Sequence, residues 1–205
     1  KEIDEYLKTA IDYIHKNNGV ACATHPNVPY WYDYDFDAVD MEPMRTLAGT
    51  DIEKYWLSGR KIAVMNSVDL FGVRRLADNP AVNFIYLNGE APSRESVVSA
   101  IKSGHTIASA GFDEVDIKLN GYLPGDTISS ETAINGRIDI SAKTKEGKIC
   151  KLRIYSADKL IYEKDFNSQD IELSITPENF TPEKFIRVEL EGEHPGRICN
   201  CTPFY

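Results

Sequence analysis

The hydrophobic pattern of this chain changes its period near residue 111. Before that point, stretches with apolar residues every three or four positions alternate with short apolar runs. After it, apolar residues recur at every second position, as they do over 186–190. The first pattern is typical of strands and helices that alternate in a mostly parallel sheet, and the second of antiparallel strands. We therefore predict two domains, 1–111 and 112–205.

The first part is predicted to contain three helices and about five strands. An apolar stripe over 3–14 predicts an amphipathic helix, and Asn17-Asn18-Gly19 follows it as a helix end. Thr50-Asp-Ile-Glu53 has the form of a capping box and predicts a second, short helix. Pro92-Ser93 predicts the start of a third helix, which Gly104 follows. The strands are expected at 20–24, 38–41, 61–65, 83–87 and 106–110.

The second part predicts an Ig-like antiparallel β-sandwich. About seven short strands in roughly 90 residues are typical of that architecture. Turn pairs such as Asn120-Gly121 and Glu146-Gly147 separate the strands. The strands are expected at 115–119, 134–141, 149–155, 159–164, 171–175, 185–190 and 197–202.

Three of the strands predicted in the first part lead into polar side chains. The run Val20-Ala-Cys-Ala-Thr-His25 brings a histidine to a strand end. Asp40 lies near the end of the next strand and Glu42 just after it, and Asp69 follows the third. The carboxyl ends of neighbouring parallel strands converge on one crevice, where ligands bind. A histidine and several carboxylates in such a crevice can hold a hard or borderline metal ion.

These motifs resemble a known family. Gly19-Val-Ala-Cys-Ala-Thr-His25-Pro26 resembles the Gly-Gly-x-x-x-x-x-His-Pro segment of the PHP superfamily (polymerase and histidinol phosphatase). The order of the later motifs is similar to that of the CehA/McbA-like metallohydrolases, and the resemblance covers nearly all of the chain. Those motifs are Asp40-Met-Glu42, Tyr55-Trp56, Asn66-Ser-Val-Asp69, Ala100-Ile-Lys-Ser-Gly104, Leu123-Pro-Gly-Asp126 and Cys201-Thr-Pro-Phe-Tyr205.

The resemblance implies a fold and a chemistry. The fold would be the C-terminal part of a PHP-type distorted (β/α) barrel over 1–111, followed by the sandwich. The activity would be metal-dependent phosphoester hydrolysis with zinc, manganese or iron, in which His25 and Asp69 are metal ligands. Such ions lower the pKa of bound water and polarise the scissile group.

The chain departs from the family pattern at the expected ligands. The histidine that should close the Asn66–Asp69 motif is replaced by Phe71 or Leu70, depending on the register, and the family's upstream His-x-His strand has no counterpart here. We therefore predict an incomplete metal site with weak or no activity in this chain alone, and no catalytic residue is identified. A missing N-terminal part is one explanation.

Plainer interpretations remain open for the same residues. His25 can bond a backbone carbonyl beside Pro26, and Asp69 can cap the following turn. The alternative function is a non-catalytic module that binds a glycan or another ligand through the aromatic segment 30–36 and the β-sandwich. The residues expected to line a pocket near the strand ends are Asp40, Glu42, Trp31, Tyr32 and Arg45.

Net charge and composition limit the classes of partner that this chain is expected to bind. A formal net charge of −9 argues against nucleic acid or an anionic membrane as the main partner, and no apolar run is long enough to span a bilayer. A small-molecule phosphoester or another hydrolysable small molecule is the expected substrate. An unpaired sheet edge in the first part predicts a homo-oligomer or an accessory chain of another protein. The four cysteines, Cys22, Cys150, Cys199 and Cys201, suit buried thiols or a disulfide from Cys150, and they leave the compartment unknown.

Overall fold

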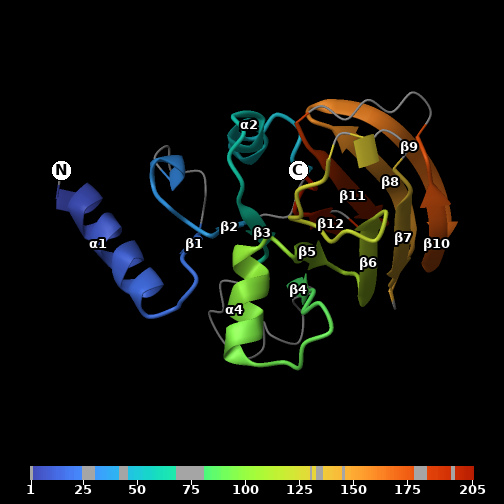
Figure 1. Cartoon of the computed structure of the whole chain (residues 1–205). Coiled ribbons are helices and arrows are strands. Elements are labelled where there is room, and N and C mark those ends of the chain that lie inside the picture. The colour runs from blue at the N-terminus through green and yellow to red at the C-terminus, as the bar shows by residue number, and fades with distance from the viewer. Residues whose placement is uncertain are drawn as a thin grey trace.

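The structure is a computed structural model of the 205-residue chain. It describes residues 2–24, 31–41, 46–67, 81–129, 131–132, 136–144, 146–177, 184–194 and 197–205. Within these ranges the helices are α1 (Glu2–Lys16), η1 (Trp31–Asp33, a 3₁₀ turn), α2 (Asp51–Leu57) and α4 (Arg94–Lys102). Figure 1 shows α1 at one end of the molecule and the large antiparallel sheets at the other.

A short parallel sheet follows α1 along the chain. It consists of β1 (Cys22–Ala23), β2 (Ala38–Asp40) and β3 (Ala63–Met65), in that order. In the register, Cys22 lies opposite Ala38, and Ala38 lies opposite Ala63. The strands are short, and six of their eight residues are buried, as is typical of parallel strands covered on both faces.

In the described part of the chain, the edge of β3 that faces away from β2 is closed by two threonine side chains. The Thr202 hydroxyl accepts a hydrogen bond from the Val64 amide at 3.0 Å, and the Thr106 hydroxyl donates to the Val64 carbonyl at 2.8 Å. The two hydroxyls lie 2.8 Å apart and share a hydrogen bond. Because buried backbone groups need partners, these two residues attach the parallel sheet to the strands that carry them.

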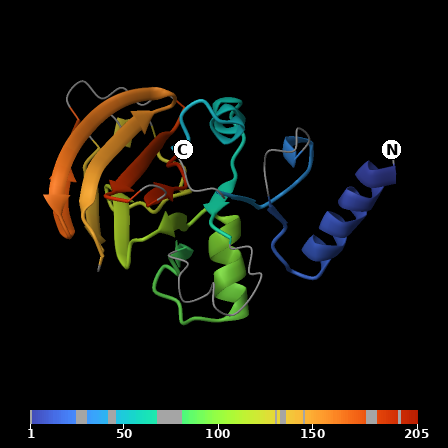
Figure 2. The ribbon, with the colours of Figure 1, turned by 180° about the vertical axis from the view of Figure 1, so that it is seen from behind.

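The remaining strands form two antiparallel sheets, seen from behind in Figure 2. The six-stranded sheet has the order β4-β5-β12-β11-β8-β9, and the three-stranded sheet has the order β10-β7-β6. The bounds are β4 (Ala81–Ile85), β5 (Thr106–Ala110), β6 (Glu114–Leu119), β7 (Ile138–Lys143), β8 (Ile149–Ser156), β9 (Lys159–Ser168), β10 (Asp170–Ile175), β11 (Ile186–Gly192) and β12 (Ile198–Cys201).

Each face of the six-stranded sheet covers a different core. One face packs against the three-stranded sheet through alternating side chains such as Leu152 and Val188. The other face meets the parallel sheet and α2, where Ala108 packs among Val64 and Trp56. The six-stranded sheet is therefore the middle layer of the molecule.

The helix ends follow the predicted capping residues. The Thr50 hydroxyl accepts from the Glu53 amide at the start of α2, and Ser93 and Ser96 form a reciprocal capping box at the start of α4. Gly104, with φ +76°, ends α4 in the left-handed conformation that glycine adopts without strain. The Glu53 side chain departs from the predicted box, because its carboxylate accepts from the Gly49 amide at 2.6 Å.

The predicted fold class is wrong in its main feature. The sheets are open, and no closed or partial (β/α) barrel exists within the described residues; only β1, β2 and β3 run parallel there. β4 and β5 were expected to join them, but β4 pairs antiparallel with β5, and β5 pairs antiparallel with β12. A helix between two strands suggests a parallel unit, but the pairing of β5 with strands on both sides decides its direction.

Strands from both sides of residue 111 share the six-stranded sheet, since β5 ends at Ala110 and its neighbour β12 lies near the C-terminus. The division into domains at that residue stays a prediction. The four cysteines are free, and Cys199 and Cys201 are buried, so the disulfide alternative is wrong.

Candidate functional site at the edge of the parallel sheet

The parallel register brings the three strand ends to one edge of the sheet. Asp40 lies opposite Met65, and Ala23 lies opposite Val39, so the chain leaves β1, β2 and β3 on the same side. The segments that leave there run toward His25, Glu42 and Asp69. Those three residues and Arg45 lie outside the described residues, so the predicted His25–Asp69 pair stays a prediction.

Asp40 is the central described residue of this edge. Its side chain is fully buried (0% exposed). One carboxylate oxygen accepts from the Ser67 amide at 3.0 Å, and the other accepts from the Ser67 hydroxyl at 2.5 Å. The segment that follows β3 is thus held against the end of β2. A buried carboxylate needs such donors, because burial without them costs several kcal/mol, about 2–7 for a polar group.

Two asparagines extend this edge to the antiparallel sheet. The Asn66 amide donates to the Asn83 side-chain oxygen at 2.6 Å, and the Asn83 side chain donates back to the Asn66 carbonyl at 2.8 Å. The Asn66 side chain donates to the Ser109 carbonyl at 2.9 Å. The strand-end position of Asn66 was recognisable from the sequence, whereas nothing near Asn83 in the sequence indicated its partner.

Cys22 lies beside this edge but is poorly suited to chemistry. Its burial, with the negative charges of Asp40 and Asp37, raises the pKa of the thiol to about 11. Because the thiolate is the nucleophile and the metal ligand, the protonated thiol of Cys22 is neither at neutral pH.

The aromatic residues predicted to line a pocket separate into two environments. Trp31 is 6% exposed and packs on Tyr55 with ring centroids 5.1 Å apart, so it belongs to the core beside α2. Its indole nitrogen has no hydrogen-bond partner in the described part of the chain. Tyr32 is half-buried, and it borders a surface hollow of about 340 Å³ with Tyr55 and Arg60. The Arg60 guanidinium lies 4.0 Å from the Tyr55 ring centroid.

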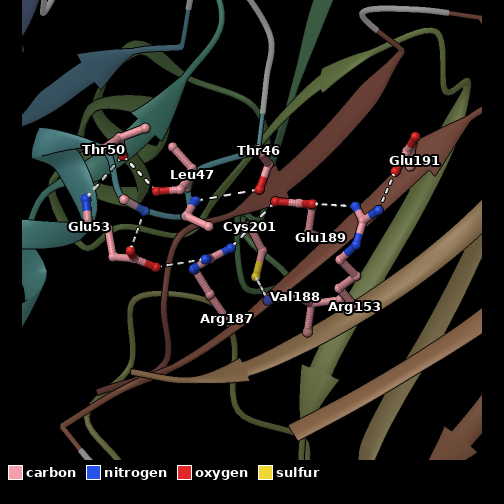
Figure 3. Close-up of polar contacts among 12 residues, drawn as sticks. Thr46, Leu47, Thr50, Glu53, Arg153, Arg187, Val188, Glu189, Glu191 and Cys201 are labelled. Atoms are coloured by element: carbon pink, nitrogen blue, oxygen red, sulfur yellow. Dashed lines mark hydrogen bonds and ion pairs between the residues drawn. The ribbon is translucent and has the colours of Figure 1, made fainter. Parts of the chain in front are cut away.

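A buried network of charges links α2 to the six-stranded sheet (Figure 3). The Arg187 guanidinium is 1% exposed and donates to Glu53 at 2.8 Å, while Glu189 lies 3.5 Å away. Glu189 in turn accepts from Arg153 at 2.8 Å, and Arg153 also reaches Glu191 at 2.6 Å.

The charges of this buried network alternate in sign, so each charged group is stabilised by neighbours of the opposite charge. Partial burial works against the charged form of Arg153, but the hydrogen bonds that its guanidinium donates to Glu191 and Glu189 outweigh it and raise the pKa of the guanidinium above its usual value. The Arg187 guanidinium also lies 3.7 Å from the centroid of the Tyr155 ring. This arrangement fixes α2 against the sheet, and it leaves no open, reactive group.

The alternation in β11 partly indicates this network. Ile186, Val188 and Leu190 face the inner core, so Arg187 and Glu189 must point to the opposite face. That face of an antiparallel sheet is commonly solvated, and only the packing of α2 against it turns these charges into buried ones.

No group of three or more His, Cys, Asp or Glu side chains is placed to hold a metal ion among the described residues. His15 lies 2.9 Å from Asp37 and 4.0 Å from Asp35, and His105 lies 3.0 Å from Asp126. The described residues alone therefore do not make a metal centre, and Asp40 is the only carboxylate they contribute at the strand edge.

Comparisons of the chain with family models, with curated proteins and with solved structures found no match. None of the helices in the described ranges combines the length and the apolar character that a bilayer crossing needs.

Proposed function

We propose that this chain derives from a metal-dependent phosphoester hydrolase and keeps part of its site at the carboxyl edge of β1, β2 and β3. The proposal gives the chain weak or no hydrolytic activity by itself. Its predicted metal ligands, His25 and Asp69, follow β1 and β3. The motif order in the sequence supports the lineage, independently of the overall fold.

The observation that carries the proposal is the fully buried carboxylate of Asp40 at the strand edge. Ligands bind at the carboxyl ends of strands in open sheets that contain parallel strands. Asp40 ties the end of β2 to the segment after β3 through Ser67, and that segment continues toward Asp69. The same edge receives the segment of His25 from β1.

The number of metal ligands determines how tightly this site is expected to bind a metal ion. A catalytic zinc site uses about three protein ligands, whereas two are predicted here. A bound divalent ion would supply an activated water and polarise a phosphoryl oxygen. With two ligands, binding should be weak and easily reversed by a chelator.

Calorimetric titration with Mn²⁺ and Zn²⁺ tests this directly, together with a phosphatase screen using para-nitrophenyl phosphate. We expect weak binding that His25→Ala and Asp69→Ala each reduce at least about tenfold, as loss of a ligand should. The matched control is His194→Ala, because His194 is exposed and far from these strands in sequence. Equal binding by wild type and His25→Ala would refute the proposal.

A second candidate function rests on the hollow beside Tyr32. Two tyrosine rings and the Arg60 guanidinium border it, and Lys54 and Asp51 add a cation and an anion. Aromatic faces with adjacent polar groups suit the stacking of a sugar ring. Screening on a glycan array, with Tyr32→Ala as the test and Tyr122→Ala as an exposed control, separates this function from the first. Binding that Tyr32→Ala leaves unchanged would exclude this hollow.

A further inference from the structure

Three of the Asn-Gly pairs in this chain lie within the described residues: Asn18-Gly19, Asn88-Gly89 and Asn120-Gly121. In each pair the asparagine has a φ between 50° and 52°, in the left-handed region that asparagine enters more readily than most residues. Glycine has no Cβ, so its amide nitrogen can approach the side chain of the preceding residue closely. The surroundings of the three pairs differ, and this difference should determine how reactive each asparagine is.

The pair Asn88-Gly89 forms an open turn between β4 and α4 (Figure 1). Both residues are exposed, and one backbone hydrogen bond closes the turn, from the Glu90 amide to the Leu87 carbonyl at 2.9 Å. Among the described residues, neither the Asn88 side chain nor the Gly89 amide has a hydrogen-bond partner. Nothing lies within 4 Å of the position that a Cβ would take on Gly89. The side-chain carbon and the backbone nitrogen are therefore both accessible to each other.

The other two pairs are each held by specific contacts. Asn120 is also exposed and has the same φ, but its side-chain oxygen accepts from the Arg137 amide at 2.8 Å. Its side-chain nitrogen donates to the Thr132 carbonyl at 2.9 Å. In the third pair the amide of Gly19 is the group that is held, because it donates to the Ile14 carbonyl at 2.8 Å.

We propose that Asn88 is a site of spontaneous deamidation in the folded protein. The Gly89 nitrogen, after losing its proton to the solvent, attacks the side-chain carbonyl carbon of Asn88. A carbon–nitrogen bond forms and closes a succinimide ring, while the bond to the side-chain nitrogen breaks and ammonia leaves. Water then opens the ring at either carbonyl and leaves aspartate or isoaspartate at this position. Each event adds one negative charge to the exposed turn.

The hydrogen bonds determine the order of reactivity. The attack brings the glycine nitrogen up to the preceding side chain, so the turn has to open first. At Asn88 the opening breaks the one bond between Glu90 and Leu87, whereas at Asn120 the two side-chain bonds must break as well. From the usual contribution of such bonds, Asn88 should react at least about tenfold faster than Asn120.

Incubation of the native protein in weakly alkaline buffer tests the site. Peptide mass spectrometry, with fragmentation that locates the modified residue, gives the rate at Asn88, Asn120 and Asn18. We expect aspartate and isoaspartate to accumulate at Asn88 at least about tenfold faster than at the other two positions. In urea the three rates should become similar, because each asparagine precedes a glycine and the hydrogen bonds of the fold are lost.

A matched pair of variants gives a second measurement. Asn88→Gln has a longer side chain, which forms a cyclic imide far less readily, so it should remove the main acidic species that appears on isoelectric focusing. Asn120→Gln should leave that species in place. Equal native rates at Asn88 and Asn120, or an acidic species that persists in Asn88→Gln, would overturn the inference. A rate order that stays the same in urea would also overturn it, since the structure would then not determine the site.

Discussion

The parallel sheet and the antiparallel double sheet are built on different scales. β1, β2 and β3 have two or three residues each, and their edge is closed by threonine hydroxyls. β8 and β9 have eight and ten residues and take part in a continuous core between two sheets. This difference shows that the candidate site lies on the smaller of the two regions, the parallel sheet. That sheet therefore depends on the six-stranded sheet for its stability. Local stability should be lowest where the strands are shortest.

The largest expected effect comes from the connection between these two regions. Arg187→Ala leaves Glu53 buried without its cationic partner, which costs about 3–5 kcal/mol of unfolding free energy. Urea denaturation followed by tryptophan fluorescence measures it. Arg137→Ala is the matched control, because Arg137 is 63% exposed beside its partner Asp139, and such surface pairs contribute about 0–1 kcal/mol. Equal losses of unfolding free energy in both variants would mean that the buried network of charges does not connect the region of the parallel sheet to the antiparallel sheets.

A cavity in the double sheet should have the next largest effect. Leu152 is fully buried between the sheets, and Leu152→Ala should lower the unfolding free energy by about 2–5 kcal/mol. Leu160→Ala, 48% exposed on the adjacent β9, should change it by less than about 0.5 kcal/mol. A single cooperative transition in all variants is expected, because the middle sheet belongs to both cores. Two separated transitions would show that the regions unfold independently.

A change at the strand edge should have a smaller and local effect. Asp40→Asn replaces one acceptor of the Ser67 hydrogen bonds by a donor, at a cost of about 1–3 kcal/mol. Amide hydrogen exchange should become faster in β2 and β3 and stay unchanged in β8 and β11. Asp139→Asn, which removes an acceptor from Ser174 in the double sheet, should act only on β7 and β10. Exchange that rises equally in all strands would contradict this locality.

The smallest effect concerns the reactivity of Cys22. Its pKa of about 11, against 9.0 for an ordinary thiol, leaves about 100-fold less thiolate at pH 8. Alkylation of Cys22 by iodoacetamide, followed by mass spectrometry of the peptide that contains it so that Cys150, Cys199 and Cys201 do not contribute, should be correspondingly slower in the native chain than in urea. Because the folded pKa is raised, stability falls as pH rises from about 9 to about 11. Equal rates in the native and denatured chain would contradict the burial of this thiol beside Asp40.

The sequence predicts local structure here better than it predicts long-range pairing. The predicted strands 115–119 and 171–175 lie within β6 and β10, and the helix expected after Ser93 is α4. Alternating apolar residues and helix-capping residues are local signals, so they can be recognised in the sequence without knowledge of the fold. The direction of β5 was wrong because it depends on β12, a partner distant in the sequence.

The same holds for the candidate site: local sequence signals predicted positions along the strands, but not contacts with residues distant in the sequence. Asp40 was predicted near the strand ends from its position after an apolar run, and the structure places it there. Trp31 was expected in a pocket but is buried in the core, because its exposure depends on Tyr55 of α2. Glu53 was expected only as a capping residue, and its contact with Arg187 spans most of the chain. His25, Glu42, Arg45 and Asp69 lie outside the described residues and stay predictions.

The central place of β5 has a consequence for synthesis on the ribosome. β5 ends at Ala110, but β12, which fills its second side, begins only at Ile198. At about 5–20 residues per second, the nascent chain presents that edge for roughly 5–20 s before its neighbour is made. A chaperone that shields β5 during this interval should therefore raise the yield of correctly folded protein.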